Sequence, residues 1–181
     1  MKIRRIIFLI LIIINCITIF YFSNQEADTS SSSSGRVVNF VMKVLPQFKN
    51  MEEHQKEHIA NEILQPIVRK MAHFSIYTLL GFLTINFALV CKKKTLVCNT
   101  DKLIASPLQL KIGRNKRILY SWLFGTLYAI SDEIHQLFIP GRSCEFRDIC
   151  IDSLGVLMGI TIMIIVIKIF TKIKNSCRGG Y

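Results

Sequence analysis

Four long apolar runs constrain the fold of this sequence more than any other feature. They cover residues 6–22, 71–90, 118–139 and 149–170 and contain 17, 20, 22 and 22 residues. A helix rises about 1.5 Å per residue, so runs of this length match a hydrocarbon core roughly 30 Å thick. Only helices cross lipid in such lengths without leaving backbone groups unpaired. The sequence therefore predicts an all-α integral membrane protein with four transmembrane helices.

The charge composition excludes a nucleic-acid-binding protein. A net charge of +11 would suit that class if the basic residues shared one solvated surface. Here apolar runs separate them, and we expect no nucleic-acid partner. The first run follows a basic start, as in a signal peptide, but it is longer than the usual apolar core of roughly 7–15 residues, and no small-residue cleavage site follows. We expect it to be retained, with residues 1–181 forming a single membrane domain.

The distribution of lysine and arginine predicts the orientation. Fifteen of the 23 basic residues precede the first span, close the chain from Lys168 onward or lie in the basic loop 91–117, together with the single acid Asp101. The other side carries eight basic and eleven acidic residues. Cytoplasmic loops are enriched in lysine and arginine. Both termini and the basic loop are therefore expected in the cytoplasm of a cell-membrane protein. An oxidising exterior would allow Cys144 and Cys150 to pair.

The outer segment, residues 23–70, contains a polar stretch followed by amphipathic patterns. One threonine and five serines at residues 29–34 predict a flexible stretch. Beyond Gly35, Val37, Val41, Val44 and Phe48 recur at helical spacing. The segment is too polar to span a membrane. It predicts an outward-facing amphipathic helical insertion between the first two spans, lying in the headgroup region or packing as a soluble cap on the bundle.

Polar residues collect at the outer ends of the last three spans. Ionisable groups within spans cost roughly 2.5–3.5 kcal/mol each at mid-membrane, and they usually mark a functional site. Helical neighbour spacing places several of them on shared faces. We therefore predict a polar pocket open to the outside; the alternative is a structural ion-pair network at the wet interface. The candidate binding residues are Lys70, His73, Tyr77, Asp132, Glu133, His135, Gln136, Arg142, Asp148 and Asp152.

The composition of this predicted pocket leaves the ligand open. Lys70, His73, His135, Arg142 and Arg147 suit the phosphate or pyrophosphate of a lipid headgroup. The five acids nearby argue against a purely anion-binding site. A divalent metal held by the two histidines and the carboxylates is an alternative, either structural or as a bridge to phosphate. No strict ligand spacing supports it, so we expect no resident cofactor.

The fourth span contains the motif Gly155-x-x-x-Gly159. Small residues at this spacing let two helices approach closely, within one chain or between protomers. Internal packing is favoured, and an oligomer formed through the two glycines is the alternative.

Several motifs resemble those of VanZ-like membrane proteins. The run from Asp132 to Arg142 reads D-E-I-H-Q-L-F-I-P-G-R, and Asp148 and the two spaced glycines follow it. Asp152 stands where many relatives are expected to carry asparagine. Other pieces match the family's pattern in order, namely Phe22-Ser23-Asn24-Gln25, Ser34-Gly35 and Lys70-x-x-His73-Phe74-x-x-Tyr77.

The resemblance implies a small multi-span bacterial protein of a family whose founder is associated with low-level teicoplanin resistance. No settled biochemical activity comes with the family. We therefore expect a non-enzymatic envelope protein, surrounded by membrane lipids, whose outer pocket engages a lipid headgroup, a cell-wall precursor or a lipoglycopeptide antibiotic. The alternative is a membrane-embedded enzyme acting on a phosphorylated or lipid-linked substrate, with His135 as general acid or base.

Overall fold

The computed structural model describes residues 2–25, 27–48, 51–91, 107–142 and 144–176. No strand occurs in these ranges, which confirms the predicted all-α class. Most of the basic loop 91–117 lies outside the described residues, although its last part belongs to a helix. The elements in chain order are α1 (Lys2–Ser23), α2 (Ala27–Val44), η1 (Pro46–Phe48), α3 (Glu53–Ile59), η2 (Ala60–Leu64), α4 (Gln65–Val90), α5 (Pro107–Gln136) and α6 (Phe146–Ser176).

Within the described residues, three helical segments are long and apolar enough to cross a membrane. They are Lys2–Ser23, His54–Val90 and Phe146–Ile173, and they contain three of the four predicted spans. This apolarity identifies a membrane protein. The remaining predicted span, 118–139, falls in α5, which is continuous but more polar because four basic residues lie near its start and Asp132 and Glu133 lie in its last third. Helix α5 ends at Gln136, before the predicted boundary.

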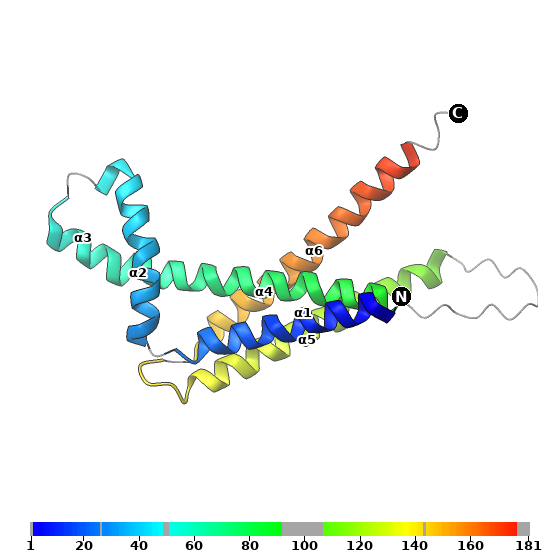
Figure 1. The fold of residues 1–181 in the computed structure, drawn as a ribbon, viewed down its shortest axis with the longest axis horizontal. Coiled ribbons are helices and arrows are strands. Elements are labelled where there is room, and N and C mark those ends of the chain that lie inside the picture. Colours follow the sequence, from blue (N-terminus) through cyan, green and yellow to red (C-terminus); the bar gives the residue numbers. More distant parts are fainter. Residues whose placement is uncertain (1, 26, 49–50, 92–106, 143, 177–181) are drawn as a thin grey trace, which may run out of the picture.

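The helices are arranged so that several of their ends meet at one side of the bundle. Helices α1, α4 and α5 lie along one another, and α6 crosses α4 and then leaves the bundle (Figure 1). The end of α1, the end of α5 and the start of α6 meet near the first turns of α4, where α2 runs across the bundle (Figure 1). At the opposite end, Arg5 Nε donates to the Val90 carbonyl at 3.4 Å.

Two glycines let α6 approach α4 closely. A Cβ atom added at Gly155 would lie 2.7 Å from the carbonyl oxygen of Phe74. A Cβ atom at Gly159 would overlap the carbonyl oxygen of Thr78. Both glycines are buried against α4. The Gly-x-x-x-Gly motif therefore packs inside the chain, which is the arrangement favoured from the sequence.

Val156 of α6 packs against both α4 and α5. It is fully buried, and it lies against Gly81 of α4 and Gly125 of α5, two further positions where a side chain would collide with it. Gly81 thus makes room for the main chain of Val156, and Gly125 makes room for its branched side chain. The other buried apolar residues of this core are Ile12, Ile19, Tyr77, Leu80, Leu83, Ile85, Ala129 and Ile160.

The outer segment is more helical than expected. Helix α2 begins at Ala27 and so includes the serine run that was predicted to be flexible. Serine is only moderately unfavourable in a helix, and extending an existing helix adds one hydrogen bond for each residue ordered. In the amphipathic part, Val38 is buried, whereas Val37 and Val44 of the predicted stripe and Phe40 beside it are exposed. The other two stripe residues, Val41 and Phe48, are half-buried, so half of the predicted apolar stripe is exposed.

The helix of the second predicted span starts well before residue 71. Helical structure runs from α3 through the wider π-type turn η2 into α4, with Pro66 in the first turn of α4. A proline inside a helix removes one hydrogen bond and crowds the carbonyl four residues earlier. A wide turn just before Pro66 relieves that crowding, and the helix continues through the residues that line the site.

Candidate functional site

A small polar pocket lies where α4, the end of α5 and the start of α6 meet. Its volume is about 60 Å³, enough for a few waters at about 10–15 Å³ each or for one small ionic group. Pockets that enclose drug-sized molecules measure roughly 300–1,000 Å³. The size therefore suits a headgroup rather than a whole antibiotic. The lining residues are Arg69, Lys70, His73, Glu133, Gln136, Gly141, Arg142, Glu145, Asp148, Ile151 and Asp152.

A tight turn between α5 and α6 places Arg142 in the pocket. The Arg142 N–H donates to the Ile139 carbonyl at 3.2 Å, so Pro140 and Gly141 occupy the two central positions. Gly141 has a φ of 73°, which other residues rarely adopt. Proline followed by glycine is the combination that a type II turn favours.

Among the described residues, the Arg142 guanidinium donates to neutral acceptors. Its Nε donates to the Gln25 carbonyl at 3.1 Å and its Nη2 to the Phe22 carbonyl at 3.4 Å, which caps the end of α1. Its Nη1 donates to Gln136 Oε1 at 3.4 Å. Burial lowers the pKa of Arg142, and the positive charge of nearby Arg69 lowers it further, while the negative charges of Asp132 and Glu133 oppose this shift.

Arg69 is a pocket residue that the sequence analysis did not select. It lies one residue before Lys70 and lines the same pocket. Within the described residues it makes no hydrogen bond and no ion pair. Its position four residues before His73, which is a helical neighbour spacing, was the signal that could have identified it.

Part of the cluster is an ion-pair network, as the structural alternative expected. Lys70 Nζ lies 2.5 Å from Asp148 Oδ1 and 3.3 Å from Glu145 Oε2. Arg147 Nη2 lies 3.0 Å from the same Glu145 oxygen. Arg147 and then Lys70 lower the pKa of the Glu145 carboxyl. The Glu145 N–H also donates to Glu133 Oε2 at 3.1 Å. Lys70 is therefore already neutralised, and Glu145 belongs to the site although it was not a candidate.

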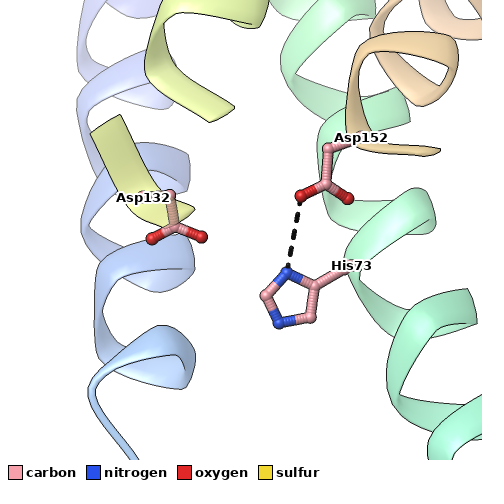
Figure 2. A group of neighbouring side chains, drawn as sticks. All are labelled: His73, Asp132 and Asp152. Carbon is pink, nitrogen blue, oxygen red and sulfur yellow. Dashed lines mark ion pairs between the residues drawn. The ribbon is translucent and has the colours of Figure 1, made fainter. Parts of the chain in front are cut away.

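Three predicted residues meet deeper in the bundle, one from each of three helices. Figure 2 shows His73 of α4, Asp132 of α5 and Asp152 of α6 pointing toward one another. His73 Nδ1 lies 3.8 Å from Asp152 Oδ2. Both carboxylates are almost fully buried, with Asp132 4% and Asp152 2% exposed. Gln136 Nε2 donates to Asp132 Oδ2 at 3.5 Å.

Two buried hydroxyl groups face Asp132. The side chains of Ser23 and Tyr77 are both fully buried and lie next to this carboxyl. Neither hydroxyl makes a hydrogen bond of acceptable geometry to any described group. Tyr77, a predicted candidate, therefore adjoins the site without lining the pocket, and Ser23 was not a candidate at all.

His135 points away from the pocket, contrary to its predicted roles. Its ring stacks on Phe20 with centroids 4.7 Å apart, and its Nε2 lies 3.3 Å from Asn24 Oδ1. Three residues beyond Asp132 on a helix, it is rotated toward α1, where an aromatic ring is available. It can neither pair with His73 in a metal site nor act as general acid or base in this pocket. The two outer cysteines, Cys144 and Cys150, are exposed free thiols.

The comparison with protein families identifies the family of this chain. A sequence model of the VanZ/LLP1 family matches residues 8–168. The chain belongs to the VanZ/LLP1 family. The match extends from α1 into α6 and includes every residue that lines the pocket. The comparison with curated proteins gave no match, and neither did the comparison with solved structures.

In this VanZ/LLP1 chain, three of the separated motifs that carried the resemblance meet at one site. The Phe22-Ser23-Asn24-Gln25 piece supplies the carbonyls that hold Arg142 and the hydroxyl that faces Asp132. The Lys70-x-x-His73 piece contributes one wall of the pocket. Ser34-Gly35 instead lies in α2, away from the pocket lining.

Proposed function

We propose that this VanZ/LLP1 protein is a bacterial envelope membrane protein that holds the phosphate or pyrophosphate of a lipid headgroup or lipid-linked cell-wall precursor. One observation carries the proposal. Arg69 and Arg142 present two positive charges to a single pocket, and neither is ion-paired with a carboxylate in the described residues. Guanidinium groups bind phosphate oxygens in pairs of parallel hydrogen bonds. A phosphate between the two would relieve their mutual repulsion.

The proposed topology has four spans, with the pocket at the outer surface. Helix α5 runs along α1 and α4 (Figure 1), and its acidic last third lies at the pocket end, where charges near the interface cost less than at mid-membrane. The basic residues Lys2, Arg4 and Arg5 lie at the other end of α1. Excess basic charge favours the cytoplasm for that end, and hence for both termini. The exposed apolar side of α2 would lie in the outer headgroup region.

The proposal limits how such a protein gives low-level teicoplanin-type resistance. A pocket of about 60 Å³ accepts a phosphate but does not enclose a lipoglycopeptide. Resistance would then arise from binding the lipid-linked precursor that the antibiotic targets.

An enzyme acting on a phosphorylated lipid is the second candidate. It is favoured by His73, which lines the pocket with Nδ1 3.8 Å from Asp152 Oδ2. Histidine at this position, rather than His135, would be the general acid or base. Release of inorganic phosphate from a polyprenyl pyrophosphate, measured with and without divalent metals, separates this candidate from simple binding.

Binding of a polyprenyl pyrophosphate to the purified protein in nanodiscs of neutral lipid tests the proposal. Arg69→Gln should weaken binding about ten- to a hundredfold, the loss expected for hydrogen bonds between charged groups worth roughly 1.5–3 kcal/mol. Arg147→Gln is the matched control, because Arg147 is exposed, pairs with Glu145 and does not line the pocket. Wild-type affinity in a folded Arg69→Gln variant would refute the proposal. Parallel measurements of teicoplanin susceptibility connect the binding to resistance.

A further inference from the structure

Three side chains of metal-ligating types converge at the pocket that Arg69 and Arg142 also line. One nitrogen of His73 and one oxygen each of Asp132 and Asp152 lie within 4.8 Å of one another (Figure 2). Each residue comes from a different membrane helix. Because the glycine contacts between α4 and α6 set the helix positions, the three groups are held together by the fold and not by a local loop.

The negative charges of Asp132 and Asp152 are only partly compensated: His73 lies near both carboxylates, and Arg142 acts on Asp132 without bonding to it. Asp132 and Asp152 are two nearly fully buried carboxylates, and within the described residues their only ion-pair partner is His73, at 3.8 Å from Asp152. Lys70 is engaged by Asp148 and Glu145, and the Arg142 guanidinium is bonded to neutral carbonyl groups. Buried carboxylates without full compensation are costly, and paired or metal-bound arrangements are the usual solution.

Two neighbouring hydroxyl groups hold one of the carboxylates. Ser23 of α1 and Tyr77 of α4 are fully buried next to the Asp132 carboxyl of α5. Their hydroxyls can donate to Asp132, although neither makes a bond of ideal geometry to a described group. Carboxylates that bind metal ions are commonly oriented by hydrogen bonds from such outer groups.

We propose that His73, Asp132 and Asp152 form a binding site for a divalent transition-metal ion, with Zn²⁺ and Mn²⁺ as the best-matched ions. An imidazole favours transition metals, while two carboxylates suit Zn²⁺ and the harder Mn²⁺. Bonds of about 2.0–2.2 Å place the ligand atoms of one ion roughly 3–3.5 Å apart. Small side-chain rotations bring the three observed atoms to that spacing. Water molecules would complete the coordination, while Ser23 and Tyr77 orient the Asp132 carboxylate.

The role of this metal site in phosphate binding rests on the proposed function, but its metal binding does not. His73 and Asp152 line the phosphate pocket, so the ion would add positive charge to the pocket that Arg69 and Arg142 also line. A metal ion can bridge to phosphate oxygens and neutralise their charge. The site itself requires only the three ligands and can bind its ion in the absence of any phosphate.

Metal titration of the intact protein tests the site. The protein is purified in detergent, stripped with EDTA, and titrated with ZnCl₂ and MnCl₂ in phosphate-free buffer by isothermal calorimetry. Mn²⁺ binding is followed in parallel by electron paramagnetic resonance. One equivalent should bind and raise the unfolding temperature. Asp132→Asn, Asp152→Asn and His73→Gln should each weaken binding at least about tenfold.

The matched control is Asp148→Asn. It removes a carboxylate from the same pocket, but one that is paired with Lys70, and it should keep wild-type metal affinity. Three results would each overturn the proposal: no saturable binding by the wild type, equal affinity in the ligand variants, or an equal loss in Asp148→Asn. If the wild type binds no metal and Asp152→Asn is more stable than wild type, the two carboxyls share a proton instead.

The same samples separate this proposal from the phosphate proposal. Arg69→Gln removes no metal ligand and should bind the metal normally. Polyprenyl pyrophosphate binding measured in EDTA reports on the arginines alone. Failure of the metal titration would therefore leave the phosphate result unaffected, and the reverse also holds.

Discussion

Replacing Gly159 by alanine probes the close contact that holds α6 on α4. A Cβ atom at this position would overlap the Thr78 carbonyl oxygen, and one at Gly155 would lie 2.7 Å from the Phe74 carbonyl oxygen. Ordinary contacts begin near 3.4 Å. The obstructing atoms belong to the main chain, so they cannot rotate away, and α6 has to move outward. The contacts of Val156 with Gly81 and Gly125 would open as it does.

The expected loss follows from two opposing effects. Overpacking a tight contact costs typically 1–3 kcal/mol, and main-chain obstruction favours the upper part of that range. Alanine gains up to about 1 kcal/mol over glycine in a helix. We therefore expect Gly159→Ala to destabilise the protein by about 2 kcal/mol, and Gly155→Ala by about 1–2 kcal/mol. Asp152, one turn before Gly155, would move away from His73 in both variants.

The single tryptophan supplies the assay. Trp122 Nε1 donates to Ser153 Oγ at 3.0 Å, so its fluorescence reports on the contact between α5 and α6. Unfolding in mixed micelles is compared for wild type, Gly159→Ala and the control Gly35→Ala. Gly35 has nothing within 4 Å of an added Cβ atom, and its substitution should stabilise by roughly 0.5–1 kcal/mol. An increase in stability of similar size for Gly159→Ala would refute the packing argument.

Three further predictions concern the polar contacts. Lys70→Met should destabilise by about 1–3 kcal/mol, because it leaves Asp148 without its partner and removes one of the two partners of Glu145. A double-mutant cycle with Asp148→Asn should show coupling, and additive effects would disprove the ion pair. Ser153→Ala should cost about 1 kcal/mol and alter Trp122 emission; an unchanged spectrum would argue against that hydrogen bond. The basic partners of Glu145 lower its pKa below the ordinary 4.5, so the stabilising contribution of this carboxylate is full above that pH and is lost as the pH falls through the lowered pKa. The difference in unfolding midpoint between wild type and Glu145→Gln should therefore shrink at acid pH. A constant difference would contradict the charge-based explanation.

The length and polarity of the segments were readable from the sequence because they are local properties. Apolar runs of membrane-spanning length predicted helices, and the shared depth of polar residues placed Lys70, His73, Asp148 and Asp152 at one end of the bundle. The structure brings these four to one pocket. The serine run was misjudged because helix propagation from neighbouring residues outweighed its weak propensity.

Which residues each polar side chain contacts depends on the tertiary structure. Sequence spacing gives the angle of a residue around its own helix, but not the rotation of that helix against the next. His135 thus turned to Phe20, while Arg69 and Ser23 entered the site unexpectedly. The close glycine contacts between α4 and α6 determine that His73 meets Asp152. No local sequence pattern specifies the register of these contacts. The sequence by itself determined a helical membrane protein with polar residues at one end; the packing of its helices decided which of them form a site.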